Sequence, residues 1–410
     1  MNLDFARSQF PALDGDWVYF DNGGGSQILQ PVLNRLQDYL ITSNVQLGAS
    51  YGVSRRAASR LAEAQAAMAV LVNTNDPAEI VMGPSTSVLL RTLAASVGET
   101  ISPGDEIVVT NADHEANVGP WLALERRGAV LRFWEADPTS GELRLEDLLP
   151  LLGPRTRLVS VTHASNILGT INPIRAIADR VHAEGALLCV DGVGYAPHRA
   201  VDVGELDVDF YAFSFYKTFG PHHAVLYGRK ELLLDLPGQS LSFISEDDVP
   251  YKFQPGNVNY ELSYSMLGLT DYLTALASGG VGVDALPVAV SRTAIERAFV
   301  LIAAHEEVLS RRLLDFLTDR PGVRLLGNVL PDQALRVPII SFVIDGMKSA
   351  DVVREIDAHR IGIRFGNFHS PRLVRALGLD GDDGVVRVSM VHYNTVEEID
   401  RLTALLDALV

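Results

Sequence analysis

The stretch SFYKTFGP (residues 214–221) places a lysine in a tight turn directly after the apolar run 210–213. Earlier in the chain, Asp191 ends a second apolar run, 186–190. Continuous apolar runs of this length predict strands that are buried on both faces of a parallel sheet. Ligands of such sheets bind beyond the carboxyl ends of the strands. We therefore expect Lys217 and Asp191 to lie at the ligand-binding edge of the sheet.

A lysine and an aspartate at neighbouring strand ends are what a pyridoxal 5'-phosphate (PLP) site needs. The amine of Lys217 would form a Schiff base with the aldehyde of the cofactor, and Asp191 would keep its pyridine nitrogen protonated. Taken alone, a lysine such as Lys217 is more often a surface residue in a loop, and an aspartate such as Asp191 more often caps a strand. The motifs below favour the cofactor site.

Strand-like runs alternate with helix-like stretches from about residue 79 to residue 228. This alternation predicts an α/β fold, with a mostly parallel seven-stranded sheet in a large domain. The predicted strands are Glu79–Met82, Glu106–Thr110, Ala129–Trp134, Arg157–Thr162, Ala186–Val190, Asp209–Phe213 and Ala224–Tyr227.

The pattern changes after residue 260, where shorter elements predict a smaller α+β domain. We expect residues 21–282 to form the large domain and 283–410 the small one, with the segment 1–20 packing with the small domain. Thr395 and Glu398 predict a capping box at the start of the last helix. The remaining predicted elements are helices Leu262–Ala277, Val288–Leu317 and Ala350–Ala358, and strands Pro338–Ile344 and Val385–Met390.

The bulk composition excludes several classes of partner. The formal net charge of −17 over 410 residues argues against nucleic acid and anionic membranes, because both attract basic surfaces. The only cysteine, Cys189, lies in an apolar run and is expected to be a small buried hydrophobe. We see no signal-peptide pattern and no apolar run of about 20 residues, so we expect a soluble cytoplasmic protein. The histidines show no metal-ligand spacing, and no metal is predicted.

Three hydroxyl residues, Ser85, Thr86 and Ser87, precede the predicted helix Val88–Val97. Ser85 and Thr86, at the start of this helix, would bind the cofactor phosphate. The alternative is an ordinary helix cap, which is far commoner. Gly23-Gly24-Gly25 lacks the spacing of a dinucleotide fingerprint, so a dehydrogenase is disfavoured.

Three further residues have both a functional and a structural interpretation. His114 could stack on a flat cofactor ring and shuttle protons, or be a solvated histidine near a helix cap. Asn166 could donate to the phenolic oxygen of the cofactor, or simply form a turn. Arg387, in a strand-like run, fits bidentate binding of a substrate α-carboxylate, or a structural ion pair.

Taken in order, the motifs resemble the cysteine desulfurase-like branch of the class V aminotransferases, a family with PLP fold type I. The likeness runs nearly from end to end. The motifs are YFDN at 19–22, DHEAN at 113–117, SNILGT at 165–170, DG at 191–192, SFYK at 214–217, RVS at 387–389 and YNT at 393–395.

The resemblance implies roles for individual residues. It puts His114 over the cofactor ring, Ser214 and the Tyr216 hydroxyl at the phosphate, and Lys217 in the Schiff base. Asn257 would reach the phosphate of a neighbouring subunit, which implies a homodimer with active sites at the subunit interface. Arg387, together with Asn22 and His369, is expected to contact the substrate.

The departures from the family bear on the reaction. Cysteine desulfurases carry a loop cysteine that attacks the substrate sulfur and becomes a persulfide. The corresponding stretch here is 364–370, and His369 stands at the cysteine position. Cys189, in a predicted strand, cannot replace it. A persulfide mechanism is therefore not expected, and His369 is either an acid for the leaving group or a polar loop residue.

We expect a PLP-dependent enzyme whose small-molecule substrate is an L-amino acid. Lys217 would act as the base at the α-carbon, and C–S bond cleavage by β-elimination needs no nucleophilic cysteine. Transamination and epimerisation share the steps up to the α-carbanion and stay open. A non-catalytic PLP-binding relative is a further alternative, which the intact Lys217, Asp191 and Arg387 disfavour.

Overall fold

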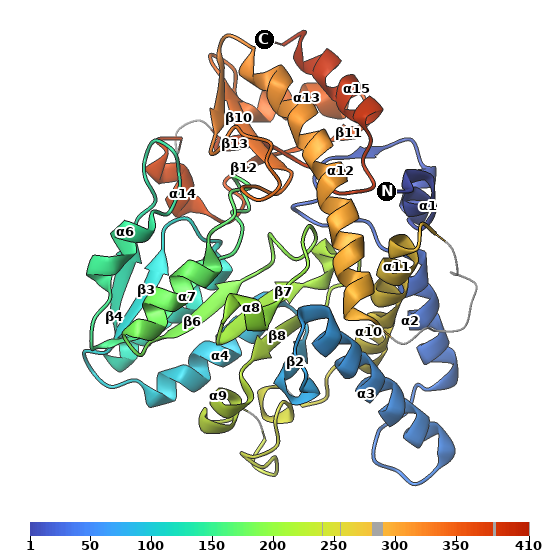
Figure 1. Cartoon of the computed structure of the whole chain (residues 1–410), viewed down its shortest axis with the longest axis vertical. Helices are drawn as coiled ribbons and strands as arrows, with labels where there is room; N and C mark the ends of the chain where they lie inside the picture. The colour runs from blue at the N-terminus through green and yellow to red at the C-terminus, as the bar shows by residue number, and fades with distance from the viewer. Residues whose placement is uncertain (240, 255, 281–289, 380–382, 410) are drawn as a thin grey trace. The chain divides into compact units, whose positions relative to one another are not determined.

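The computed structural model describes residues 1–239, 241–254, 256–280, 290–379 and 383–409 (Figure 1). The chain divides into two compact units. Unit 1 comprises Met1–Ala12, Gln27–Ile101 and Arg199–Leu301, and unit 2 comprises Leu13–Ser26, Ser102–His198 and Ile302–Val410. The predicted boundary at 282–283 lies outside the described residues, so the division into a large and a small domain stays a prediction. No helix among the described residues is long and apolar enough to cross a membrane.

The predicted α/β fold with a mostly parallel seven-stranded sheet is confirmed. The strand order is β2-β8-β7-β6-β5-β3-β4. Within the sheet, β8 runs antiparallel to both β2 and β7. The strands are β2 (Ile80–Gly83), β3 (Glu106–Thr110), β4 (Val130–Trp134), β5 (Thr156–Thr162), β6 (Leu187–Asp191), β7 (Phe210–Ser214) and β8 (Ala224–Gly228).

One helix of unit 1, α4 (Thr86–Thr100), packs against all three of its strands. The stretch 262–277, predicted as one helix, is two helices that meet at Met266, where the Met266 N–H bonds to Ser263 O, three residues back. At Gly268 the backbone of the second helix approaches Val32 so closely that a Cβ would lie 2.4 Å from the Val32 nitrogen. The helices are α1 (Leu3–Ser8), α2 (Gln30–Thr42), α3 (Gly52–Val72), α4 (Thr86–Thr100), α8 (Val203–Leu206), α9 (Lys230–Asp235), α10 (Tyr260–Ser265) and α11 (Leu267–Ala277).

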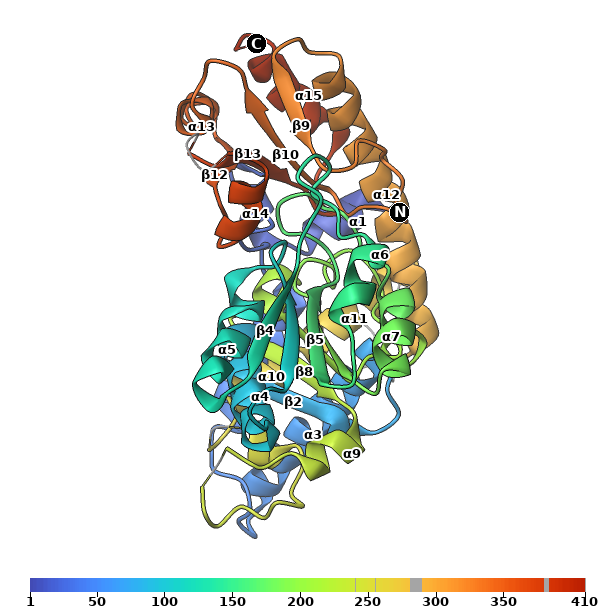
Figure 2. The same cartoon turned by 90° about the vertical axis from the view of Figure 1, so that its left-hand side faces the viewer.

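Unit 2 holds a second, antiparallel sheet with the order β12-β13-β10-β9. Figure 2 shows the helices α13 (Ser349–Asp357) and α15 (Val396–Leu406) beside its strands. The apolar core between helices and strands includes Phe342, Ile356 and Leu402. A separate parallel pair joins β1 to β11. The strands are β1 (Val18–Tyr19), β9 (Val323–Leu326), β10 (Ile339–Ile344), β11 (Ile361–Gly362), β12 (Arg364–Gly366) and β13 (Val385–Ser389).

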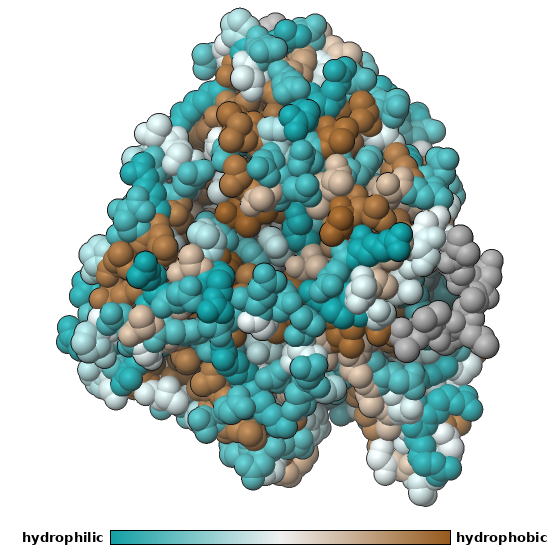
Figure 3. Space-filling view, in the orientation of Figure 1, coloured by the Kyte–Doolittle hydropathy of each residue, from teal (hydrophilic) through white to brown (hydrophobic). Residues whose placement is uncertain are grey.

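The helices of unit 2 start where local signals favour them. Thr395 accepts from the Glu398 N–H and the Glu398 side chain accepts from the Thr395 N–H, so the predicted capping box is confirmed. The helices are α5 (Gly119–Leu122), α6 (Leu145–Leu148), α7 (Ile174–Ala183), α13 (Ser349–Asp357), α14 (Pro371–Ala376) and α15 (Val396–Leu406), while α12 (Arg292–Thr318) begins in unit 1 and ends in unit 2. Figure 3 shows hydrophilic residues over most of the visible face, as the high content of acidic residues leads us to expect.

Candidate active site

A cluster of hydroxyl groups lies at the carboxyl edge of the unit 1 strands. Because β2 and β7 both run antiparallel to β8, they point in the same direction and end at one edge. Thr86 begins α4 and Ser214 ends β7; their hydroxyl oxygens are 2.6 Å apart, and the Thr86 N–H donates to Ser214 Oγ over 3.4 Å. Ser85 caps α4 by accepting from the Val88 N–H at 3.3 Å. Hydroxyls at the N-terminus of a long helix suit a phosphate.

Lys217 lies on the short 3₁₀ turn Phe215–Lys217, which directly follows Ser214. Its half-buried amine is 5.7 Å from the centroid of the Tyr216 ring, and that ring stacks on His222 with 4.9 Å between centroids and an interplanar angle of 9°. An aromatic face attracts an ammonium group. Lys217 and the Ser214 hydroxyl, which would suit a phosphate, lie at the same turn. The contact of the Tyr216 hydroxyl with phosphate stays a prediction.

Asn257 lies at the surface of unit 1. Its side-chain amide donates to Gln46 Oε1 over 3.3 Å, and the Tyr260 hydroxyl donates to the same oxygen over 3.5 Å. Both hydrogen bonds stay within one chain. The expected contact of Asn257 with the phosphate of a neighbouring subunit stays a prediction.

Asp191 ends β6 and is only 4% exposed. Its carboxylate accepts from the Val193 N–H at 2.9 Å, which fixes the direction in which the side chain points. The neighbouring residue on β5 is Thr162, paired in register with Asp191. A buried carboxylate at a strand end is the group that a protonated pyridine nitrogen requires.

Asp113 is a second buried carboxyl group at this edge, and it was not predicted as a site residue. It is 3% exposed and accepts from Asn117 Nδ2 over 2.6 Å and from the Thr110 hydroxyl. Burial raises the pKa of Asp113 to about 7, and the charge of Asp191 adds to the rise. A usable signal was in the sequence, because Asp113 follows an apolar strand just as Asp191 does.

His163 is another buried group next to Asp191 that was missed. The backbone N–H of His163 donates to the backbone carbonyl of Asp191 at 2.8 Å. The His163 ring stacks on the Tyr195 ring, with 3.5 Å between the ring centroids and an interplanar angle of 11°. Burial lowers the pKa of His163 to about 3, so the ring is neutral at neutral pH. The sequence offered no signal for this stack, since the two residues are on separate turns.

His114 caps the short 3₁₀ turn Glu115–Asn117 with its ring. Its Nδ1 accepts from the Ala116 N–H at 3.0 Å, so a neutral ring must carry its proton on Nε2. The centroid of the His369 ring is 5.3 Å from that of His114, at an angle of 58°. The structure thus brings together two of the predicted site residues, in one unit. The stacking of His114 on a cofactor ring stays a prediction.

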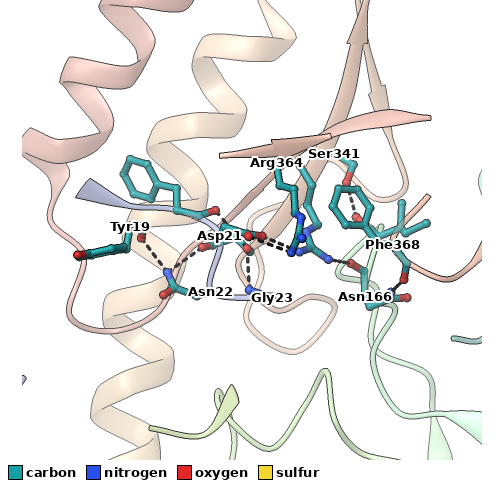
Figure 4. Close-up of polar contacts among 12 residues, drawn as sticks. Tyr19, Asp21, Asn22, Gly23, Asn166, Ser341, Arg364 and Phe368 are labelled. Atoms are coloured by element: carbon teal, nitrogen blue, oxygen red, sulfur yellow. Dashed lines mark hydrogen bonds and ion pairs between the residues drawn. The ribbon is translucent and has the colours of Figure 1, made fainter. Parts of the chain in front are cut away.

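Arg387 belongs to a polar network, of which Asp21, Asn166 and Arg364 are labelled in Figure 4. It is 2% exposed, and its Nη2 donates to Asp21 Oδ1 over 2.9 Å while Nη1 donates to the Asn166 carbonyl over 3.1 Å. Arg364, its cross-strand neighbour, also contacts the Asp21 carboxylate, at 3.3 Å. The Phe368 ring centroid is 3.8 Å from the guanidinium carbon of Arg387. Both interpretations of Arg387 therefore have support: it forms a structural ion pair, and its planar fork matches a carboxylate.

Asn22 is buried, and both ends of its amide are engaged. The nitrogen donates to Tyr19 O and to Ser389 O, each over 2.9 Å, and the oxygen accepts from the Tyr393 hydroxyl. These bonds tie the YFDN and YNT motifs together within unit 2. A contact of Asn22 with substrate stays a prediction.

Each unit holds side chains that fit a part of PLP. Unit 1 supplies a helix N-terminus, the paired hydroxyls of Thr86 and Ser214, and a lysine on the adjoining turn. Unit 2 supplies the buried Asp191 carboxylate and an arginine fork. The groups of unit 1 match the phosphate and the aldehyde of the cofactor, and those of unit 2 match its pyridine nitrogen and the carboxylate of an amino acid.

Comparisons with known proteins agree with this chemistry. The family model described as Aminotransferase class-V matches residues 18–280 and 291–402. The aminotransferase-like protein FGM3 of Gibberella zeae is 43% identical over 99% of this chain and 98% of that protein. The cysteine desulfurase-like protein ustD of Aspergillus flavus is 35% identical over 100% of this chain and 91% of that protein.

Solved structures show the same fold. The cysteine desulfurase of Thermococcus onnurineus NA1 superposes with a TM-score of 0.85 and 27% identity, covering 98% of this chain and 97% of that one. The family match covers most of the chain and includes the segments that carry Asp191, Lys217 and Arg387. The chain therefore belongs to the class V aminotransferase family, in its cysteine desulfurase-like branch, and is a PLP-dependent enzyme of fold type I.

Proposed function

We propose that this enzyme cleaves a C–S bond of an L-amino acid by β-elimination, without a persulfide on a loop cysteine. The observation that carries the proposal lies in the segment 364–370, where His369 replaces the nucleophilic cysteine that the family likeness implies. The only cysteine of the chain, Cys189, is 0% exposed inside β6. A reaction that expels sulfur from the α-carbanion requires no sulfur nucleophile from the protein.

The roles of the residues follow from their chemistry. When bound, the cofactor supplies an electron-withdrawing ring that stabilises negative charge at the α-carbon of the substrate. Arg387 holds the substrate carboxylate through its fork, and Lys217 takes the α-proton. The Asp191 carboxylate keeps a proton on the ring nitrogen, and Ser214 with Thr86 holds the phosphate.

The proposed enzyme works as a homodimer in the cytoplasm. Three large apolar side chains support a contact with a second copy: Leu40, Ile41 and Tyr51 are exposed near the end of α2 and the start of α3, on the same unit as Asn257. Large apolar side chains that are exposed close together in the chain suit an interface. Light scattering of the purified protein should give twice the chain mass, and the mass of a single chain would contradict the dimer.

Product analysis tests the proposed reaction. The enzyme is incubated with cysteine, cystine, cysteine sulfinate and S-substituted cysteines, and sulfide or thiol, pyruvate, ammonia and the pyridoxamine form of the cofactor are measured together. We expect thiol or sulfide with equimolar pyruvate and ammonia. Accumulation of the pyridoxamine form with a keto acid would instead show a transaminase, and no turnover of any amino acid would show a non-catalytic relative.

The lysine assignment has its own control. Borohydride should fix the cofactor covalently to the wild-type protein and not to Lys217→Ala. The variant Lys230→Ala, which removes a lysine that pairs with Asp76 at the surface, should be fixed like the wild type. Covalent fixation to Lys217→Ala would show that another residue binds the aldehyde.

A further inference from the structure

The loop Asn367–Ser370 has an unusual backbone. Phe368 and His369 are both in the left-handed region, with φ of 50° and 60°, and the Ser370 N–H closes the turn on the Asn367 carbonyl at 2.8 Å. The His369 N–H also donates to Asn367 Oδ1 over 3.1 Å. Left-handed conformations are uncommon for bulky residues and persist where the surroundings over-determine them. Two such residues in succession indicate that the position of this loop is strongly specified.

Three hydrogen bonds anchor the loop to two other turns of unit 2. The Asn166 amide donates to the Phe368 carbonyl over 2.9 Å and accepts from the Ser370 hydroxyl over 2.9 Å, so one side chain holds both ends of the turn. The Glu115 N–H donates to the His369 carbonyl at 2.7 Å. The loop is thus fixed on one side to the SNILGT motif and on the other to the DHEAN motif.

The anchoring sets the positions of two side chains. The Phe368 ring lies 3.8 Å from the guanidinium carbon of Arg387, so it covers one face of the group that would bind the substrate carboxylate. The next residue, His369, has its ring 5.3 Å from that of His114. A left-handed backbone at both positions is what turns consecutive side chains toward Arg387 and toward His114.

We propose that the anchored loop Asn367–Ser370 holds His369 in place as the proton donor to the sulfur leaving group, with Ser370 and Asn166 as its positioning residues. This inference rests on the proposed β-elimination. As the C–S bond breaks, its electron pair leaves with the sulfur, and the His369 imidazolium gives that sulfur a proton. The imidazole regains its proton from water, and the α-proton of the substrate stays with Lys217 until product leaves.

The anchoring distinguishes this role from that of a persulfide carrier. A loop that delivers sulfur to an acceptor must move away from the site, whereas a proton donor works best at a fixed place within hydrogen-bond reach of the atom it protonates. The three anchoring bonds and the two left-handed residues favour the fixed arrangement. His369 is exposed, so its imidazole is accessible to water for reprotonation.

Two single-hydroxyl variants of the holoenzyme test the anchoring. Ser370→Ala removes one of the two hydrogen bonds between the loop and Asn166, that of the Ser370 hydroxyl. Ser341→Ala is the matched control, because the Ser341 hydroxyl also donates to a carbonyl of the SNILGT turn, that of Ile167 at 2.6 Å, yet does not touch the loop. Hydrogen exchange at amides 367–370 should become faster in Ser370→Ala only. Exchange that is equal in the two variants would overturn the anchoring.

The basicity of the leaving group tests the proton donor. An alkyl thiolate needs a proton to leave, while a nitrophenyl thiolate leaves without one. His369→Gln should therefore lower kcat by about 100-fold for an S-alkylcysteine, within the usual range for general acids, and much less for S-(nitrophenyl)cysteine. Ser370→Ala should lower kcat in the same direction by roughly 10-fold, and Ser341→Ala should leave both rates unchanged.

The outcomes separate this inference from the proposed function. Equal losses of kcat for both substrates in His369→Gln would overturn the proton-donor role while leaving β-elimination intact. If the wild-type enzyme releases no thiol from either substrate, both the proposed function and the proton-donor role fall. The exchange measurement needs no turnover, so it decides the anchoring in either case.

Discussion

The Asp113→Asn variant should stabilise the protein most at alkaline pH. Asp113 is fully buried, and its pKa is raised from 3.8 to about 7, first by burial and then by Asp191. A carboxyl group whose pKa is higher in the folded state favours folding while protonated, and this advantage is lost as the pH rises from about 4 to 7. At about 1.4 kcal/mol per pKa unit, ionisation of Asp113 costs the folded state about 4 kcal/mol at pH 8 and about 2 kcal/mol at pH 5.

The replacement removes this cost, keeps the bonds to Asn117 and Thr110, and leaves a carbonyl oxygen for the backbone N–H of Thr162, which also donates to the Asp113 carboxyl group. The carbonyl oxygen of the new side chain would accept from Asn117, as the carboxylate does at 2.6 Å, and its amide nitrogen would donate to the Thr110 hydroxyl. The gain in the free energy of unfolding over wild type should therefore be about 2 to 3 kcal/mol larger at pH 8 than at pH 5. Effects of other titrating groups cancel in this difference.

Urea unfolding of the full chain, freed of cofactor, measures the effect at the two pH values. Removal of the cofactor matters because a cation beside Asp191 would favour the ionised form of Asp113. Ser160→Ala is the control: it removes the hydroxyl that donates to Asn117 Oδ1 at 2.8 Å but no ionisable group, so its pH dependence should match wild type. A gain for Asp113→Asn that is equal at both pH values, or larger at pH 5, would refute the reasoning.

Three further results are expected. Burial lowers the pKa of His163 and His392 to about 3 and that of His223 to about 4. Because these histidines are protonated in the unfolded chain as the pH falls below 6.5 but stay neutral in the folded chain, each histidine should remove about 2 kcal/mol of stability between pH 8 and pH 5. A thermal midpoint that does not change over this range would contradict the prediction. Arg387→Gln should lower kcat/KM for an amino acid about 100-fold or more but spare the corresponding amino acid amide, and equal losses would exclude the carboxylate contact. Thr395→Ala should lower the free energy of unfolding by about 1 kcal/mol through the lost capping bond, measured by urea unfolding.

Most strands of the large sheet were predictable because they are apolar runs that are buried along most of their length; the exception is β4, of which only Trp134 is buried. The predicted run Glu106–Thr110 coincides with β3, and the other strands of the large sheet agree within one residue at each end. Periodicity alone did not predict the break between α10 and α11, since it coincides with the contact of Gly268 with the backbone of α2, a feature of tertiary packing.

The site could be predicted in its residue types but not in its pairings. Lys217, Asp191 and Arg387 stand out by chemistry and by their places in motifs. The partner of Arg387 does not, because Asp21 is separated from it by 366 positions in the sequence. The same holds for Asn166, which pattern and resemblance assigned to the cofactor, and whose amide also holds a loop 204 positions away. Side-chain pairing over such separations is set by the fold and not by local sequence.

The placement of Cys189 has a practical consequence for labelling. It is the only thiol of the chain and lies fully buried in the central strand β6. Reagents that react with exposed thiolates, such as maleimides, should therefore leave the folded enzyme unmodified and active. A single cysteine introduced at an exposed position would then be the sole target for a fluorescent or spin label, so the natural sequence already serves as a background for distance measurements between its parts.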